Sequence, residues 1–199
     1  MMAFSMRYCK KIRQFLLGLL GLCLLCWQGV ALSAGSNLLV KSAEMIEIAD
    51  NYEVNALFEI SLAKEVEEAL NKGVSLTFLI EFQLTKPREY WFDSVVASET
   101  TKVTLSYHAL SKQYLIKRDN QQHSFVTLAE AKSELGILSD WAVIKKSKLE
   151  KDEAYKAALQ FRLDKSKLPK PLQVDAISSE IWSISSSPYI WAPLINRAP

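Results

Sequence analysis

Apolar and polar residues alternate one by one through several runs of this chain, and that period of two constrains the fold more than any other feature. Between Val74 and Thr85 nearly every second residue is apolar, and Ser, Thr, Glu and Gln lie between them. Successive side chains of a strand point to opposite faces of a sheet, so this run predicts a strand with one buried face. Tyr155–Leu163 repeats the pattern and predicts a second strand of the same kind.

Weaker alternation extends this prediction to most of the chain after residue 35. Glu44–Ser61 is expected to form a hairpin that turns at Asp50-Asn51. The other expected strands are Tyr90–Ala97, Lys102–Leu110, Gln113–Arg118, Trp141–Ile144 and Ile177–Ser185, the last one around Trp182. Leu168–Leu172 is expected to be an extended connector, because a proline pushes the residue before it out of the helical region.

Two segments carry helical signals instead. Leu62–Lys72 has apolar residues at helical spacing and follows Ser61, a candidate N-cap. Leu128–Leu135 follows a capping box formed by Thr127 and Glu130, and a glycine, which favours a helix end, comes after each segment. The sequence therefore predicts a mainly β (α+β) fold. We expect an antiparallel β-sandwich or curved sheet of about eight strands with two short helices, preceded by an N-terminal signal helix.

Residues 1–34 have the order of a secretory signal peptide. Four basic residues precede an apolar run that begins at Phe15, and small residues follow as far as Ala34. We expect cleavage after Ser33 or Ala34, which leaves residues 35–199 as a single exported β-rich domain in the periplasm. The apolar run is also long enough to span a bilayer, so an uncleaved inner-membrane anchor that faces the periplasm is the alternative.

The two parts of the chain differ in cysteine content and in charge. All three cysteines lie in the first 34 residues, so the rest has no thiol for a disulfide, a metal site or nucleophilic attack. Residues 35–199 carry 20 Lys and Arg against 22 Asp and Glu, a net charge of −2. Binding to nucleic acid or to anionic lipid is therefore disfavoured, and membrane contact is expected only through an uncleaved N-terminal segment.

Few residues are available for catalysis. His108 and His123 are the only histidines, and their spacing matches no metal-ligand pattern. The sequence has no Gly-x-Ser-x-Gly elbow and no glycine-rich phosphate loop, so we expect no catalytic residue, cofactor or metal site. A glycosidase-like carboxylate pair needs no sequence motif. The candidates for such a pair are Asp93, Glu99, Asp119 and Asp164.

Tryptophan is the remaining candidate for a functional side chain. Trp91, Trp141, Trp182 and Trp191 can line a groove or fill a core. Core packing is the expected use, and Trp91 and Trp191 are the better surface candidates. The segment Leu-Pro-Lys-Pro-Leu also has the extended shape that a partner can dock. The candidate binding surface therefore consists of Trp91, Trp191, Pro169 and Pro171.

Several short stretches between Glu44 and Trp191 stand in a characteristic order and spacing. They are Gly73-Val74-Ser75-Leu76, Pro87-Arg88 with Trp91-Phe92-Asp93, Tyr107-His108-Ala109-Leu110, Gln113-Tyr114, Leu163-Asp164, Leu168-Pro169-Lys170-Pro171-Leu172-Gln173 and Trp182. Together they resemble an exported proteobacterial family catalogued as domain of unknown function 4390. The resemblance implies an exported envelope protein of Gram-negative bacteria and carries over no activity, catalytic residue or ligand.

Three function classes stay open at this point. Residues 35–199 have few catalytic side chains and several expected sheet edges. This favours a non-catalytic interaction module that binds another envelope component, most simply a protein. A long apolar strand face with many aromatic residues is compatible with a carrier of a small apolar ligand in the sheet interior. A hydrolase that uses acidic residues requires two carboxylates at catalytic separation.

Overall fold

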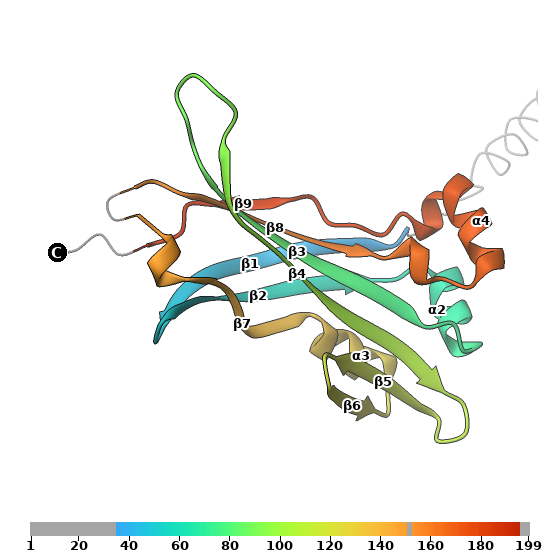
Figure 1. Ribbon diagram of the computed structural model, residues 1–199. Coiled ribbons are helices and arrows are strands. Elements are labelled where there is room, and N and C mark those ends of the chain that lie inside the picture. The colour runs from blue at the N-terminus through green and yellow to red at the C-terminus, as the bar shows by residue number, and fades with distance from the viewer. Residues whose placement is uncertain (1–34, 151–152, 196–199) are drawn as a thin grey trace, which may run out of the picture. The chain divides into compact units, whose positions relative to one another are not determined.

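The computed structural model describes residues 35–150 and 153–195, in which nine strands form two antiparallel sheets (Figure 1). The three-stranded sheet has the order β1-β2-β7, and the six-stranded sheet has the order β6-β5-β4-β3-β8-β9. The strands are β1 (Asn37–Ile48), β2 (Asn51–Ser61), β3 (Leu76–Lys86), β4 (Ser94–His108), β5 (Gln113–Arg118), β6 (Gln121–Phe125), β7 (Ile137–Lys145), β8 (Lys156–Leu163) and β9 (Tyr189–Trp191). The prediction of a mainly β, antiparallel fold is confirmed.

The two sheets pack face to face through the apolar side of the alternating strands. Phe161 of β8 contacts Phe58 of β2 with ring centroids 4.7 Å apart and Phe78 of β3 at 5.2 Å. Phe82 of β3 meets Trp141 of β7 edge to face at 6.3 Å. Each buried aromatic side chain removes a large apolar area from water, so these contacts hold the two sheets together without any disulfide.

Helices α2 (Lys64–Asn71) and α3 (Leu128–Leu135) are the two helices that the sequence predicts. The capping box of α3 is present, because Thr127 Oγ1 accepts from the Glu130 N–H at 3.2 Å and Glu130 Oε2 accepts from the Thr127 N–H at 3.4 Å. Ser61 does not cap α2, which has Ala63 at its N-cap. The Ala63 N–H instead donates to Ser36 Oγ at 2.8 Å, so a residue distant in sequence satisfies this helix end.

A third helix, α4 (Lys170–Ser178), replaces the extended connector predicted around Pro169 and Pro171, and that prediction is wrong. Pro169 comes just before the helix and Pro171 lies in its first turn. The first helical residues have no intrahelical partner for their N–H groups, so a proline costs little there. The two prolines therefore start a helix.

The last expected strand is also misplaced. Glu180–Trp182 forms a 3-10 turn in which Ser179 Oγ accepts from the Ile181 N–H at 3.3 Å, and Trp182 is buried. The terminal strand is β9, which pairs with β8. The expected strands Tyr90–Ala97 and Lys102–Leu110 are in fact one long strand, β4, which begins only at Ser94, and β6 was not predicted.

No helix within residues 35–150 and 153–195 is long and apolar enough to cross a membrane. The predicted signal peptide or N-terminal anchor at residues 1–34 lies outside the described residues.

Candidate functional site

The loop between β3 and β4 presents three consecutive aromatic side chains to solvent. Tyr90, Trp91 and Phe92 are 89%, 79% and 95% exposed. They lie between Lys86 and Ser94, which form the last pair of the β3–β4 ladder. Figure 1 shows this loop at the top, projecting beyond the ends of the neighbouring strands. We call Tyr90, Trp91 and Phe92 the aromatic tip.

The base of the hairpin is held by an ion-pair clamp. Lys86 Nζ lies 2.7 Å from Glu150 Oε2 and 3.0 Å from Glu153 Oε1, and both carboxylates come from the connection between β7 and β8. The hydrogen bond to Glu150, followed by that to Glu153, raises the pKa of Lys86. Thr85 Oγ1 also donates to the Lys156 carbonyl at 3.2 Å. The tip therefore projects from a strand end that is fixed on its β8 side.

The charges beside the aromatic tip are mostly negative. Arg88, Glu89 and Asp93 are all exposed, and none of them makes an ion pair within the described part of the chain. Together they give the loop a net charge of −1. Two carboxylates that flank three apolar rings favour a partner surface with an apolar pocket and a basic rim.

The four members of the candidate binding surface do not come together. Pro169 and Pro171 lie beyond the end of β8, where the Asp164 N–H donates to the Thr77 carbonyl at 2.8 Å. Trp91 lies beyond the opposite end of β3, and β3 has 11 residues, which span about 35 Å. Trp191 pairs with Ala157 near the Trp91 end of the sheet. Trp191 is only partly exposed, because its ring packs against Phe82 at 6.2 Å.

The four carboxylates considered for catalysis are dispersed. Asp93 lies in the β3–β4 loop, Asp119 forms the β5–β6 turn and Asp164 follows β8. Glu99 lies within β4 opposite Phe82, and Asp164 lies beyond the Phe78–Leu163 pair. A retaining or inverting pair needs carboxyl groups about 5–9.5 Å apart, and strand positions five residues apart are about 17 Å from one another. The structure does not assemble a catalytic pair from these residues.

The two histidines also lie apart from any metal-ligand cluster. His108 ends β4 and its Nδ1 lies 2.9 Å from Ser111 Oγ. His123 lies in β6 opposite Ile116 of β5, and its side chain is exposed. Among the residues that the structure describes, no group of three or more His, Cys, Asp or Glu side chains is placed to hold a metal ion.

Comparison with known proteins gives one match. The family model named Domain of unknown function (DUF4390) matches residues 35–192, which is most of the chain. The chain belongs to the DUF4390 family. No curated protein and no solved structure matches it. Any functional argument for this DUF4390 protein must therefore start from its own residues.

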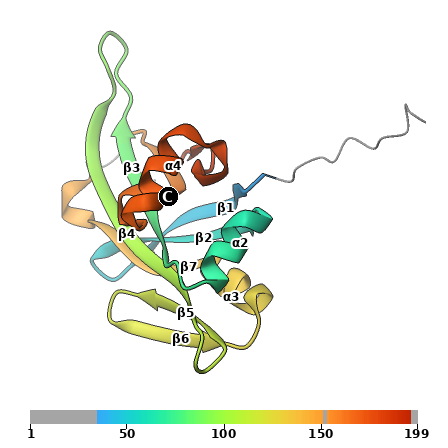
Figure 2. The same ribbon diagram turned by 90° about the vertical axis from the view of Figure 1, so that its right-hand side faces the viewer.

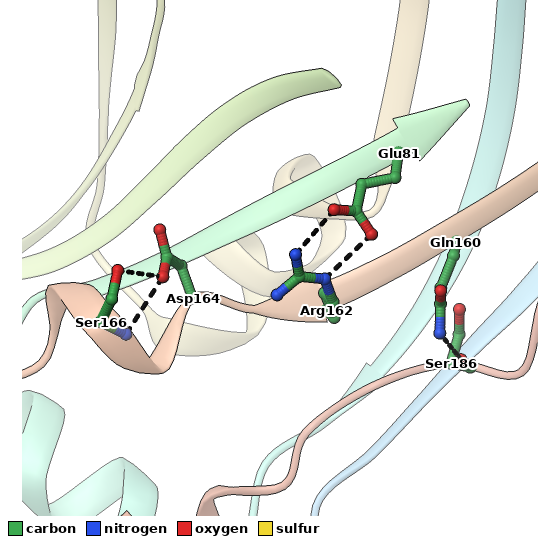
Figure 3. A network of polar contacts seen from close by, with 6 residues as sticks. All are labelled: Glu81, Gln160, Arg162, Asp164, Ser166 and Ser186. Carbon is green, nitrogen blue, oxygen red and sulfur yellow. Dashed lines mark hydrogen bonds and ion pairs between the residues drawn. The ribbon is translucent and has the colours of Figure 1, made fainter. Parts of the chain in front are cut away.

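A network of polar contacts lies along β3, β8 and the segments that follow β8 in this DUF4390 protein (Figure 3). Arg162 donates to Glu81 through Nη2 at 2.7 Å and through Nε at 2.9 Å, and Gln160 Nε2 donates to the Ser186 carbonyl at 3.1 Å. Asp164 Oδ1 accepts from the hydroxyl of Ser166 at 2.6 Å and from its N–H at 3.1 Å. The charges of Arg162 and Glu81 are satisfied by each other, so this pair stabilises the β3–β8 ladder.

A surface depression of about 490 Å³ lies beside this network, lined by residues 162–166 and 183–185. Lys165 Nζ lies 2.8 Å from Ser183 Oγ, a distance that a serine–lysine catalytic pair would also show. The same ammonium group donates to the Ala176 carbonyl at 3.0 Å. These two contacts tie α4 and the 3-10 turn to the end of β8.

The aromatic tip is the feature that sequence reasoning identified only in part. Trp91 was expected at the surface, but Tyr90–Ala97 was expected to be a strand, which would bury alternate side chains. The informative signal is the break in alternation: three aromatic residues in succession, shortly after Pro87, cannot all face a core from one strand. Tyr90 and Phe92 therefore join Trp91 in the candidate site.

Proposed function

We propose that this DUF4390 protein is an exported, non-catalytic interaction module of the periplasm that binds another envelope protein through its aromatic tip. The observation that supports this proposal is the near-complete exposure of three adjacent aromatic side chains on an anchored hairpin. The order of residues 1–34 supports export, since basic, apolar and small residues follow one another as in a signal peptide.

Covering the aromatic tip with a partner surface removes apolar area from water and so favours binding. An exposed aromatic ring contributes nothing to the core, and each ring buries about 150–250 Å² when it enters a pocket. Tyrosine and tryptophan are enriched among residues that dominate binding free energy, partly because they lose little conformational entropy. A tip with three such rings is sufficient to form the centre of a protein interface.

A protein partner fits the tip better than a membrane surface. Tyrosine and tryptophan also favour the bilayer interface, but Glu89 and Asp93 would have to approach the headgroups together with the rings. Carboxylates are repelled by an anionic surface, and the described domain has no basic patch next to the tip to offset this. A protein pocket with basic residues at its rim satisfies both the rings and the carboxylates.

The apolar-ligand alternative has no comparable support. The space between the sheets is occupied by side chains, with Phe58, Phe161 and Phe78 in direct ring contact. We therefore do not assign a carrier function to the sheet interior.

The proposal is tested by photo-crosslinking in intact cells. A photoreactive phenylalanine analogue at Trp91 is expected to give a reproducible adduct, and the double change Tyr90→Ala with Phe92→Ala in that chain is expected to reduce its yield at least about tenfold. The matched control places the same analogue at Leu110, which is 93% exposed in the β4–β5 turn at the other end of β4.

The folded state must be unchanged for this test to be informative. Because the rings are exposed, the tip substitutions are expected to change the free energy of unfolding by less than about 0.5 kcal/mol. Equal adduct yields from positions 91 and 110, or an adduct at 91 that survives both alanine changes, would contradict the proposal.

A further inference from the structure

The strand β6 is an unprotected edge of the six-stranded sheet. It pairs with β5 without a register shift, from Tyr114 opposite Phe125 to Arg118 opposite Gln121. Among residues 35–150 and 153–195, no strand pairs with its other side, so part of its backbone N–H and C=O groups face outward. Its residues 121–124 are exposed and contain no Lys, Glu, Asp or Pro, the residue types that usually block an edge.

The other three free edges of the described domain are interrupted. The β1 ladder shifts register between Val40 and Ser42, and the β7 ladder shifts twice near Asp140, which has a positive φ of 56°. The edge strand β9 has only three residues and is flanked by Pro188 and Pro193. Bulges, short strands and prolines are the features by which proteins prevent edge pairing, and β6 has no bulge or proline.

The sheet face beside β6 carries unbalanced positive charge. Lys117 of β5 lies between Thr104 of β4 and Gln122 of β6 in the ladder, so the three share one face. Lys102 lies two residues before Thr104 on that face, and both lysines are exposed. Neither makes an ion pair in the part of the chain that the structure describes, and Asp119 is the single acidic residue between positions 102 and 125.

We infer that β6 accepts an acidic, extended segment of a protein partner as a seventh strand of this sheet. Backbone hydrogen bonds along the free edge would provide the affinity, and alternate acidic side chains would face the lysines. An added strand would lie about 10 Å from the backbone of β5. The flexible side chain of Lys117 can extend across β6 toward that strand, which brings its ammonium group within a Debye length, about 8 Å at physiological salt, of a carboxylate there.

This second site goes beyond the aromatic tip and lies far from it. The tip precedes the first residue of β4, whereas β5 pairs only with the last part of β4, from Val103 to His108. Figure 2 shows the β3–β4 loop at the top and the β5–β6 ribbon at the bottom. The eight-residue step from Val95 to Val103 corresponds to about 27 Å along the strand. One partner can therefore occupy β6 without covering the tip.

Pairing of β6 with β6 of a second copy is the less favourable occupant. Two copies would bring two ribbons of the same positive charge side by side, which weakens the association. An acidic segment would form the same backbone hydrogen bonds with β6, and its negative charge would attract Lys117 instead of repelling it. The partner chemistry is therefore set by Lys117 rather than by the edge alone.

The test uses the mature chain and a short synthetic peptide of alternating glutamate and valine. Amide hydrogen exchange is expected to show about tenfold slower exchange at alternate positions of Gln121–Phe125 when the peptide is present. Two control peptides separate the two parts of the inference. One has lysine in place of every glutamate, and the other carries N-methyl groups on alternate backbone nitrogens, which blocks pairing without changing charge. Neither control is expected to protect β6.

Protein variants complete the test. Lys117→Glu is expected to weaken binding of the acidic peptide about fivefold, whereas Lys145→Glu, a matched change in β7, leaves it unchanged. Alanine changes in the aromatic tip are expected to leave the peptide affinity unchanged, so failure of one site is distinguishable from failure of the other. Protection outside β6, equal binding of the lysine peptide, or β6 protection that depends only on protein concentration would overturn the inference.

Discussion

Glu81 and Arg162 form a two-point ion pair across the β3–β8 ladder, with Nη2 2.7 Å from Oε1 and Nε 2.9 Å from Oε2. Each is diagonal to the other, since Glu81 lies opposite Gln160 and Arg162 lies opposite Leu79. The hydrogen bonds from Arg162 lower the pKa of Glu81, and the hydrogen bonds to Glu81 raise that of Arg162. The pair links β3 to β8 on the solvent side of the sheet.

The first prediction concerns stability against pH. Because the pKa of Glu81 is lower in the folded than in the unfolded chain, its stabilising effect is present above the unfolded value and is lost as pH falls through the folded value. Glu81→Gln is expected to lower the free energy of unfolding by about 1 kcal/mol at pH 7, a value that allows for the partial exposure of both side chains. Urea unfolding at pH 7 and pH 3 measures the difference, which is expected to be smaller at the lower pH.

Glu99→Gln is the matched control for this prediction. Glu99 is exposed in the neighbouring strand and has no ion-pair partner among the described residues. Its substitution is expected to change stability by less than about 0.5 kcal/mol at both pH values. If Glu81→Gln lowers the free energy of unfolding equally at pH 3 and pH 7, the loss of stability does not come from the ion pair.

The strands β3 and β8 were predictable from the sequence because the apolar residues that alternate along them are also the residues that become buried. In β3 and β8 the apolar members, such as Phe78, Phe82 and Phe161, recur every second position and all face the core. The helix α3 was predictable because its capping box is a local interaction between Thr127 and Glu130. Where the signal is local or strictly periodic, sequence and structure agree.

The errors share a different cause, which is dependence on contacts distant in sequence. The N-cap of α2 is Ala63, and its N–H donates to Ser36, which lies 27 positions earlier in the sequence. The strand β6 has no apolar alternation, and only the two-residue turn at Asp119-Asn120 and the ladder to β5 make it a strand. Trp91 was expected at the surface, but the exposure of the whole aromatic tip depends on β4 beginning at Ser94, which the local sequence does not determine.

Ser186 gives the second prediction, because its side chain completes the edge of the sheet. Its Oγ accepts from the Phe161 N–H at 3.0 Å and its own N–H donates to the Phe161 carbonyl at 2.8 Å. Ser186 is buried, so Ser186→Ala leaves the Phe161 N–H without an acceptor and is expected to cost about 1–3 kcal/mol. Exchange of the Phe161 amide is expected to become faster.

Ser187→Ala is the control for this change, since Ser187 is the next residue and is exposed. Urea unfolding compares the two variants, and the control is expected to stay within about 0.5 kcal/mol of the unchanged protein. Equal stability of both variants would mean that another group accepts the Phe161 N–H. In that case the hydroxyl of Ser186 would not be what joins the chain end to β8.

Gly136 gives the third prediction. This glycine lets the chain after α3 pack closely against β2. The residue follows α3 with an ordinary φ of −76°, so conformational freedom does not explain a glycine here. Its carbonyl accepts from the Phe58 N–H at 2.7 Å, which brings the loop directly against β2. A Cβ at this position would lie 2.5 Å from the Phe58 carbonyl oxygen. Gly136→Ala therefore requires the backbone of α3 or β2 to move.

The expected cost of Gly136→Ala is about 2 kcal/mol or more, because two main-chain segments must separate where they are hydrogen-bonded and packed. The control is Gly35→Ala, since nothing lies within 4 Å of a Cβ added there. Urea unfolding of both variants, with amide exchange at Phe58, separates loss of the hydrogen bond from a general loss of stability. If Gly136→Ala is as stable as Gly35→Ala and Phe58 stays protected, then the contact between α3 and β2 is looser than these distances indicate.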